Sequence, residues 1–315
     1  MVQVLLHAFL AVFMIFCLMA VGYVLGLLGW LTSSEKKFLS RYVINIAVPM
    51  NAVVGMLNNV GHDQLVKLGW MFCVPLIGIS VCLLFSTAAA RILRLPKKRQ
   101  GIFTAMAFLS NTLFIGLPLS TELFGEEAVP YVMVYYFGSS IYTQTAAVLL
   151  MEHAGDAAPE VHTPGQFLKD IFTKPPILGC ITAVLLLVFD LHPPVLFMHF
   201  AEYLSATLTP LALMYSGFVI YELGIRNIRF EKGILPMLVF RLIVSPLICW
   251  GFCRLFGVTG LAEKVFIVEA ALPVVTQITV MAGVYGADEK YAADGTILST
   301  LGIFITIPLL MLLLG

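Results

Sequence analysis

A polar triplet, Ser110, Asn111 and Thr112, interrupts an apolar stretch that reads AFLSNTLFIGLPLSTELFG. Pro118 follows in the same stretch. Proline lacks a backbone donor and clashes with the preceding turn, so it leaves carbonyl groups without helical partners. In lipid, such groups must be satisfied by other protein groups or by water in a cavity. The sequence therefore predicts a membrane helix that breaks near Asn111 and borders a polar pocket.

A second apolar stretch, IVEAALPVVTQITVMAG, carries Glu269, Pro273 and Gln277 in its middle. Two broken helices that meet inside a membrane would direct the positive N-terminal ends of their second halves toward one point. That point attracts an anion through unpaired N–H groups and the helix dipole. The alternative is a pair of simple proline kinks, which would not explain the Asn and Glu side chains beside the two breaks. We therefore expect an anion site where the stretches meet.

Glu269 has three interpretations, because placing a carboxylate at the centre of a bilayer costs several kcal/mol of free energy unless the group is paired, protonated or ion-bound. It could titrate as a proton-coupling acid. It could instead bind Na⁺ together with Ser110 and Asn111, since oxygen ligands suit hard cations. Finally, it could form an ion pair with Arg241, which also falls inside an apolar stretch and would then support the site.

The whole chain has the composition of a helical membrane protein, because 60% of its 315 residues are apolar and only 11% are charged. The net charge of zero provides no basic face for a nucleic-acid partner. A membrane span needs about 20 residues. The apolar runs predict ten spans: 4–29, 38–58, 66–92, 101–124, 129–152, 171–189, 195–221, 233–256, 261–285 and 291–314.

The loops between these spans alternate in charge. Of the 18 basic residues, 14 lie in the loops, or at the adjoining ends of the spans, that the ten-span arrangement assigns to one side. Basic loops mark the cytoplasmic face, so both termini are predicted to be extracytoplasmic and the protein to lie in the cell (inner) membrane.

Three landmarks recur at one separation along the chain. Pro49 and Pro210, Pro75 and Pro236, and Gly125 and Gly286 are each 161 residues apart. Five spans per half is an odd number, so the second half enters the membrane from the opposite side, as in the inverted repeats of many transporters. We expect a first five-helix repeat over 1–153, a cytoplasmic linker over 154–170 and an inverted second repeat over 171–315.

Several segments resemble the auxin efflux carrier family, which includes bacterial malate or malonate permeases. They are AVPMNAV, SNTLFIGLPLSTELFGEEA, FRLIVSPL and VEAALP. The resemblance implies ten helices in two inverted repeats, with helices 4 and 9 crossed and broken. It implies a scaffold of helices 1, 2, 6 and 7 that forms a homodimer through helices 2 and 7. Helices 3–5 and 8–10 would form a transport domain that moves as an elevator.

The resemblance also implies that a substrate carboxylate binds near the crossing, with Asn111 as the residue most directly carried over. Where auxin carriers have Gln before AALP, this chain has Glu269, which argues against auxin itself. The predicted substrate-binding residues are Asn111, Thr112, Pro273, Val274, Asn51, Gln277 and Ser139. Further candidates are Ser140, Tyr142, Thr143 and Gln144. For these four residues, and for Asn51, Ser139 and Gln277, the alternative is a hydrogen bond between helices without a role in binding.

The sequence thus predicts a secondary active transporter of small organic anions such as dicarboxylates, coupled to H⁺ or Na⁺ and requiring no other cofactor. An enzyme is not expected, because no HExxH or GxSxG motif and no pair of aspartates within spans is present. An uncoupled carboxylate uniporter or channel and a membrane sensor with the same fold are the alternatives.

Overall fold

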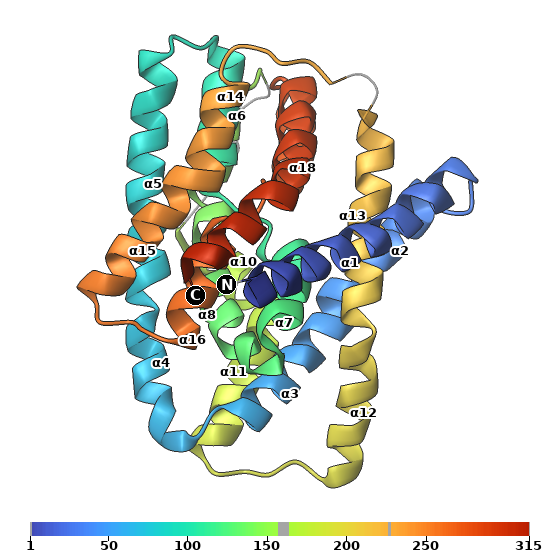
Figure 1. Cartoon of the computed structure of the whole chain (residues 1–315), viewed down its shortest axis with the longest axis vertical. Helices are drawn as coiled ribbons and strands as arrows, with labels where there is room; N and C mark the ends of the chain where they lie inside the picture. Colours follow the sequence, from blue (N-terminus) through green and yellow to red (C-terminus); the bar gives the residue numbers. More distant parts are fainter. Residues whose placement is uncertain (1, 157–163, 226–227, 315) are drawn as a thin grey trace.

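The computed structural model describes residues 2–156, 164–225 and 228–314, and the regular structure in these ranges is helical apart from one isolated β-bridge. The α-helices form an elongated bundle (Figure 1). Their bounds are α1 (Val2–Leu27), α2 (Ser33–Tyr42), α3 (Val48–Asn59), α4 (Leu65–Met71), α5 (Cys73–Ile92), α6 (Lys97–Phe108), α7 (Leu117–Phe124), α8 (Val129–Gln144), α9 (Ala146–Ala154), α10 (Pro164–Phe172), α11 (Pro175–Val188), α12 (Val195–Ala206), α13 (Leu208–Leu223), α14 (Ile234–Val239), α15 (Ser245–Leu255), α16 (Leu261–Ala270), α17 (Gln277–Val284) and α18 (Glu289–Leu314). Three π-helical segments continue or join them, η1 (Val43–Ala47), η3 (Thr112–Gly116) and η6 (Phe240–Val244), and two short 3₁₀ segments are η2 (His62–Gln64) and η4 (Glu126–Ala128).

Six helical stretches in the described ranges are long and apolar enough to cross a membrane, which makes this a polytopic membrane protein. They overlap six of the predicted spans and cover Leu5–Leu27, Ser33–Asn59, Leu65–Ile92, Val195–Leu223, Ile234–Leu255 and Glu289–Leu314. The other four predicted spans are interrupted or shorter than a full crossing. The count of ten spans and the inverted repeat therefore stay predictions.

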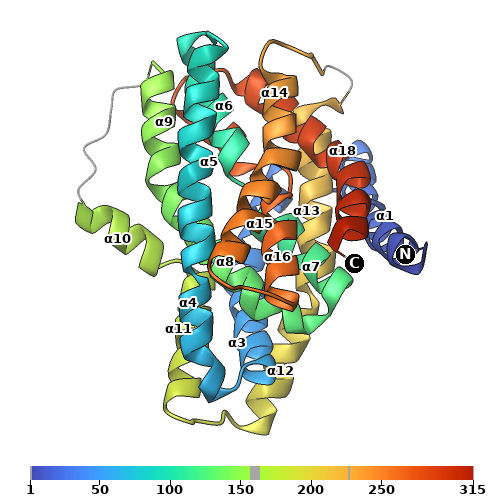
Figure 2. The same ribbon diagram turned by 60° about the vertical axis from the view of Figure 1, so that its left-hand side comes forward.

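The helices pack into two groups. In one group, α1 lies along α13, and α3 packs against α11 and α12. In the other, α5 packs against α6 and α15, and α15 packs against α16. Figures 1 and 2 show α12 and α13 along one long side of the bundle and α4 and α5 along another. One cluster of buried apolar side chains lies within the second group, and another is shared between α3 and α13 of the first group and η3 and α8.

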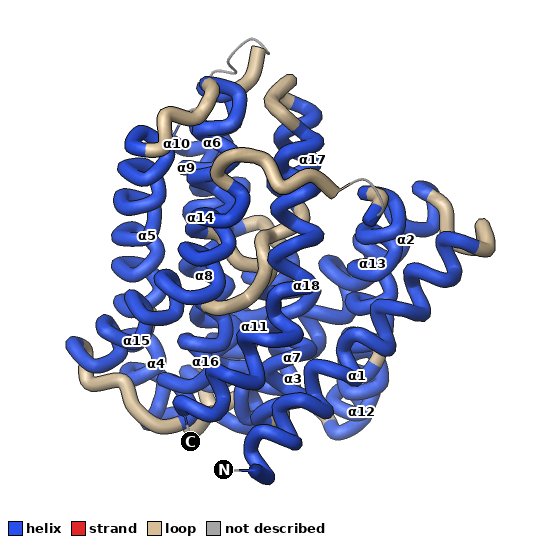
Figure 3. The backbone as a smooth tube through the Cα atoms, turned by 45° about the horizontal axis from the view of Figure 1, so that its top comes forward, coloured by secondary structure: helices blue, strands red, loops and turns tan. Residues whose placement is uncertain are grey.

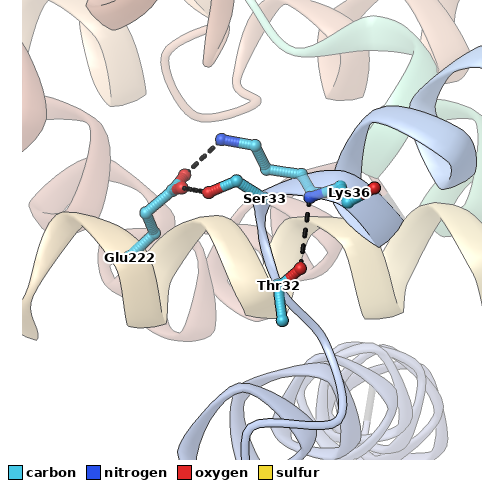
Figure 4. A network of polar contacts seen from close by, with 5 residues as sticks. Thr32, Ser33, Lys36 and Glu222 are labelled. Atoms are coloured by element: carbon cyan, nitrogen blue, oxygen red, sulfur yellow. Dashed lines mark hydrogen bonds and ion pairs between the residues drawn. The ribbon is translucent and has the colours of Figure 1, made fainter.

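Ion pairs join the loops at one end of the bundle. Lys36 at the start of α2 binds Glu222 in α13, and Ser33 donates to the same carboxylate at 3.0 Å (Figure 4). Arg99 in α6 binds both Glu231 and Asp288, the latter at 2.6 Å. These residues belong to the loops that the charge pattern assigns to the cytoplasmic face, so the structure brings those loops together.

The two ends of the chain lie on the same side of the molecule. Phe9 and Phe16 of α1 make edge-to-face ring contacts with Phe304 of α18 at centroid distances of 5.4 and 5.3 Å. The N- and C-terminal ends emerge close together in Figure 3. This arrangement fits an even number of crossings, whereas the side of the membrane that the termini face stays a prediction.

The predicted linker at 154–170 is not a loop throughout. Ala154 ends α9, residues 157–163 lie outside the described part of the chain, and helix α10 begins at Pro164 and extends to Phe172. Figure 2 shows α10 beside the bundle. Its last residue, Phe172, contacts the ring of Phe137 in α8 at 5.8 Å, which ties α10 to the bundle.

Candidate functional site

The first predicted break is present in the structure. Helix α6 ends at Phe108, Leu109 is extended, and a new helix starts at Thr112 as η3 and continues into α7. In the new helix the amide of Gly116 bonds to the carbonyl of Asn111 at 2.9 Å, five residues back. Pro118 stands in the first turn of α7, which directly continues η3, so its missing N–H leaves a carbonyl of η3 without a helical donor.

The second predicted break is also present. Helix α16 ends at Ala270, and α17 begins at Gln277. Pro273 lies in the non-helical segment between them and cannot donate to the turn that precedes it. Because both segments contain non-helical backbone, the alternative of simple proline kinks is wrong.

Main-chain contacts tie the two breaks together. Ser110 and Val274 form an isolated antiparallel β-bridge, and the amide of Asn111 donates to the carbonyl of Pro273 at 2.9 Å. The amide of Val274 donates to Oγ of Ser299 in α18 at 3.0 Å. The chain therefore crosses itself at Ser110–Asn111 and Pro273–Val274, and we call these four residues the crossover.

A cavity of about 370 Å³ borders the crossover. Asn111 is only 1% exposed, and its Nδ2 has no hydrogen-bond partner among the described residues although it is a strong donor. The predicted residues Ser110, Asn111, Thr112, Gln277, Ser139, Ser140, Thr143 and Gln144 all line the cavity. The remaining lining residues are Ser40, Ile44, Leu113, Phe114, Tyr136, Lys174, Tyr215, Val275, Thr276 and Val280.

The electrostatics of this cavity suit an anion. The helices that start at Thr112 and Gln277 both begin at its wall, and the first N–H groups of a helix have no partners within that helix. Such N-terminal ends carry about half a positive charge each. None of the described lining residues is acidic, and Lys174 is the charged residue among them.

Some residues of the cavity come from helices that the sequence analysis did not connect with the site. Tyr215 of α13 stacks on Phe114 of η3 at a centroid distance of 4.4 Å, and Ser40 of α2 lies on the same wall. Lys174 caps the start of α11. The signal that could have identified Lys174 is its place near the beginning of the predicted span 171–189, whereas nothing in the sequence distinguishes Tyr215 or Ser40 from packing residues.

Asn51 is not part of this cavity. Its Nδ2 donates to Oγ of Ser205 in α12 at 2.8 Å, and the side chain is 3% exposed. The helix that begins at Val48 turns Asn51 toward α12 and away from the crossover. Asn51 therefore makes a contact between helices, which is the alternative to a binding role. Tyr142 likewise donates to the carbonyl of Leu76 and does not line the cavity.

Glu269 lies behind η3, outside the cavity wall. The side chain is fully buried, Oε1 accepts a hydrogen bond from Oγ of Ser120 at 2.8 Å, and Oε2 has no partner among the described residues. The carboxylate packs against Gly116, where an added Cβ would stand 2.5 Å from Oε2. The Na⁺ ligand set of Ser110, Asn111 and Glu269 is thus divided, with the first two residues on the cavity and the third behind it.

Arg241 does not pair with Glu269. Its Nη1 donates to the carbonyl of Ala107 at 3.3 Å, and its Nη2 donates to Oγ of Ser245 at 2.8 Å and to the carbonyl of Ala270. The described residues provide no carboxylate within ion-pair distance of this guanidinium. The ion-pair interpretation is therefore wrong, because helix-end carbonyls occupy the arginine donors.

Comparison with known proteins gives one family and two relatives. A family model described as membrane transport protein matches residues 7–311. An uncharacterized transporter of Methanocaldococcus jannaschii is 26% identical over 299 residues, which covers 92% of this chain and 93% of the relative. An uncharacterized transporter of Methanothermobacter thermautotrophicus is 23% identical over 299 residues, and the alignment covers 93% of each chain.

Proposed function

Because this chain belongs to the membrane transport protein family, the auxin efflux carrier family of the sequence analysis, we propose that it is a secondary active carrier of small organic anions. Dicarboxylates such as malate or malonate are the proposed substrate class. The observation that carries the proposal is the side chain of Asn111, a residue that lines the crossover cavity and whose buried Nδ2 donor has no partner among the described residues. An incoming carboxylate would give this donor its acceptor.

Two further features favour a dicarboxylate. The helix N-termini at Thr112 and Gln277 provide positive partial charge, and the side-chain Nδ2 of Asn111 provides a donor, for one carboxylate at the crossover end of the cavity. Lys174 on the same cavity provides a cation for a second carboxylate. A cavity of about 370 Å³ has room for a short diacid and for a few water molecules.

An elevator movement is the proposed mechanism. The group of α1, α3, α11, α12 and α13 corresponds to the predicted scaffold, and the group that contains α5, α6, α15 and α16 corresponds to the predicted transport domain. Both halves of the site at the crossover belong to the second group, so the crossover would travel with that group as one body. The stack of Phe114 on Tyr215 joins the two groups and would have to separate during the movement. A homodimer through helices 2 and 7 would hold the scaffold fixed.

Proton coupling through Glu269 is the proposed source of driving force. A fully buried carboxyl group without an ion-pair partner must be neutralised, and a proton fits a site that has no room for a hydrated cation. Ser120 holds one oxygen of this carboxyl, and Gly116 lies in the helix that borders the cavity. Protonation of Glu269 is thereby linked to the position of η3, and Na⁺ is the alternative coupling ion.

The test is uptake of labelled malonate and malate by proteoliposomes that contain the purified protein. A carrier shows saturable uptake and counterflow, whereas a channel shows neither. We expect an inward proton gradient to stimulate uptake and a Na⁺ gradient to leave it unchanged. Uptake that requires no gradient would establish a uniporter, and absence of counterflow would refute the carrier assignment.

Two variants assign the result to the site. Asn111→Asp places a negative charge at the crossover and is expected to abolish uptake by repulsion of the substrate carboxylate. Glu269→Gln keeps the shape of the side chain and its bond to Ser120, and is expected to keep counterflow while losing the response to a proton gradient. Wild-type gradient dependence in Glu269→Gln would exclude this residue as the coupling acid.

A further inference from the structure

Arg241 is a fully buried cation that belongs to no ion pair among the described residues and does not line the cavity. It lies in η6, the π-helical segment between α14 and α15. Such bulges often mark functional positions, because they shift the direction of a single side chain. Two of its three hydrogen bonds go to main-chain carbonyls, those of Ala107 and Ala270, and both residues stand at the ends of half-helices.

These two carbonyls are among those that the breaks deprive of their helical partners. In a continuous helix, Ala107 would accept from the amide of Asn111, and Ala270 would accept from the amide of Val274. At the crossover the amide of Asn111 bonds to Pro273 instead, and the amide of Val274 bonds to Ser299. One guanidinium therefore replaces both of the amides that are diverted to form the crossover.

The charges at the crossover follow from the direction of the four half-helices. Helices α6 and α16 end there, and their C-termini carry about half a negative charge each. The helices that begin at Thr112 and Gln277 contribute about half a positive charge each, so the four ends alone sum to about zero. The guanidinium adds one positive charge at the two negative ends. Arg241 therefore gives the four helix ends of the crossover a net positive charge.

We propose that Arg241 is the positioning and charge-setting residue of the anion site. It bridges the C-terminal ends of the two broken helices, and it neutralises them so that the N-terminal ends determine the field in the cavity. This inference rests on the proposed function for the anion, whereas the bridge between Ala107 and Ala270 can be tested without any substrate.

The binding test compares wild type with Arg241→Gln and Arg241→Lys, using malonate as the probe in titration calorimetry. Arg241→Gln removes the charge and is expected to weaken malonate binding by about tenfold or more. Arg241→Lys keeps the charge but cannot form the same fork, so a smaller loss is expected. Arg99→Gln is the matched control, because it removes one positive charge near the predicted cytoplasmic face and is expected to bind malonate as wild type does.

A pH series separates charge from shape in Arg241→Lys. A buried lysine loses its proton more readily than arginine, so binding by this variant should weaken between about pH 7 and about pH 9 beyond any change in wild type. The titratable groups that face position 241 are Tyr135 of α8, Cys82 of α5 and Cys249 of α15, with Glu269 on the neighbouring α16. All four are present in wild type, whose profile is therefore the baseline. If the ratio of the malonate dissociation constants of Arg241→Lys and wild type stays the same between about pH 7 and about pH 9, the charge-setting role is overturned.

Hydrogen exchange tests the bridge itself in detergent-solubilised protein. We expect faster amide exchange in Arg241→Gln in the segments 105–117 and 268–280, and no change there in Arg99→Gln. Malonate affinity and exchange rates equal to those of wild type in Arg241→Gln would overturn the inference. If amide exchange is faster at both segments in Arg241→Gln but the wild-type protein binds no dicarboxylate, the bridge is supported and the proposed substrate is refuted. If Arg241→Gln does not fold, Arg241→Lys decides through its pH profile and through exchange at the same two segments.

Discussion

Replacement of Asn111 by alanine should reduce anion affinity without reducing stability. The lost interaction is a hydrogen bond from Nδ2 to a charged carboxylate, which is worth about 1.5–3 kcal/mol. The dissociation constant for malonate should therefore rise by about 10- to 150-fold. Stability should be nearly unchanged in the absence of substrate, because Nδ2 has no partner to lose among the described residues.

Asn51→Ala is the matched control, since Asn51 is also a buried asparagine in a membrane helix. Its Nδ2 bonds to Oγ of the half-buried Ser205 at 2.8 Å, so its loss removes a hydrogen bond and should cost about 0.5–1.5 kcal/mol of stability. Malonate affinity should stay at the wild-type value, because Asn51 lies outside the cavity. Titration calorimetry gives the affinities, and thermal unfolding in detergent gives the stabilities. An Asn111→Ala protein that binds malonate as tightly as wild type, or that melts as early as Asn51→Ala, would refute the assignment of Asn111.

Three further outcomes follow from the structure. Gly217→Ala should lower the melting temperature markedly, because an added Cβ would stand 1.8 Å from the carbonyl oxygen of Met19 and would force α13 away from α1. Thermal unfolding checks this, and Gly251→Ala is the control because its added Cβ meets nothing within 4 Å. Gly116→Ala should reduce proton-driven uptake more than counterflow, because its Cβ would displace the Glu269 carboxylate, and equal loss of both in proteoliposomes would contradict this. Burial raises the pKa of the Glu126 carboxyl in the loop after α7, so the folded state favours the protonated carboxyl. The contribution of Glu126 to the free energy of unfolding is therefore complete below the ordinary pKa of 4.5 and is lost as the pH rises through the raised pKa. Glu126→Gln should therefore raise the melting temperature at neutral pH and leave it unchanged in acid, and a melting series over pH would expose the opposite dependence.

The helix breaks were predictable from the sequence because they depend on local chemistry. Proline at 273 and the polar triplet at 110–112 interrupt helices through the backbone groups that they remove or compete for, and these effects need no knowledge of the fold. The wall residues Ser139 and Gln277 were also predicted, since polar side chains inside apolar helices have few other positions to occupy.

The partners of Asn51 and Arg241 could not be predicted in this way. Which face of a helix points to the site depends on its rotation about its own axis, and that rotation is set by packing against α12 for Asn51. Arg241 bonds to carbonyls that become available only after two distant helices have broken. An ion pair with Glu269 was one of three interpretations open from the sequence, whereas in the fold Arg241 bonds to two partial charges of the main chain.

The β-bridge between Ser110 and Val274 has a consequence for how selectivity can diverge among relatives. This bridge and the hydrogen bond from Asn111 to Pro273 are formed by backbone atoms. The position at which the two segments of the chain meet therefore does not depend on the surrounding side chains. Substitutions at Thr112, Ser139 or Gln277 can therefore alter which solute is recognised while the junction keeps its shape. If the cavity is the binding site that we propose, new specificity could arise through a few exchanges on its wall without any change at the crossover.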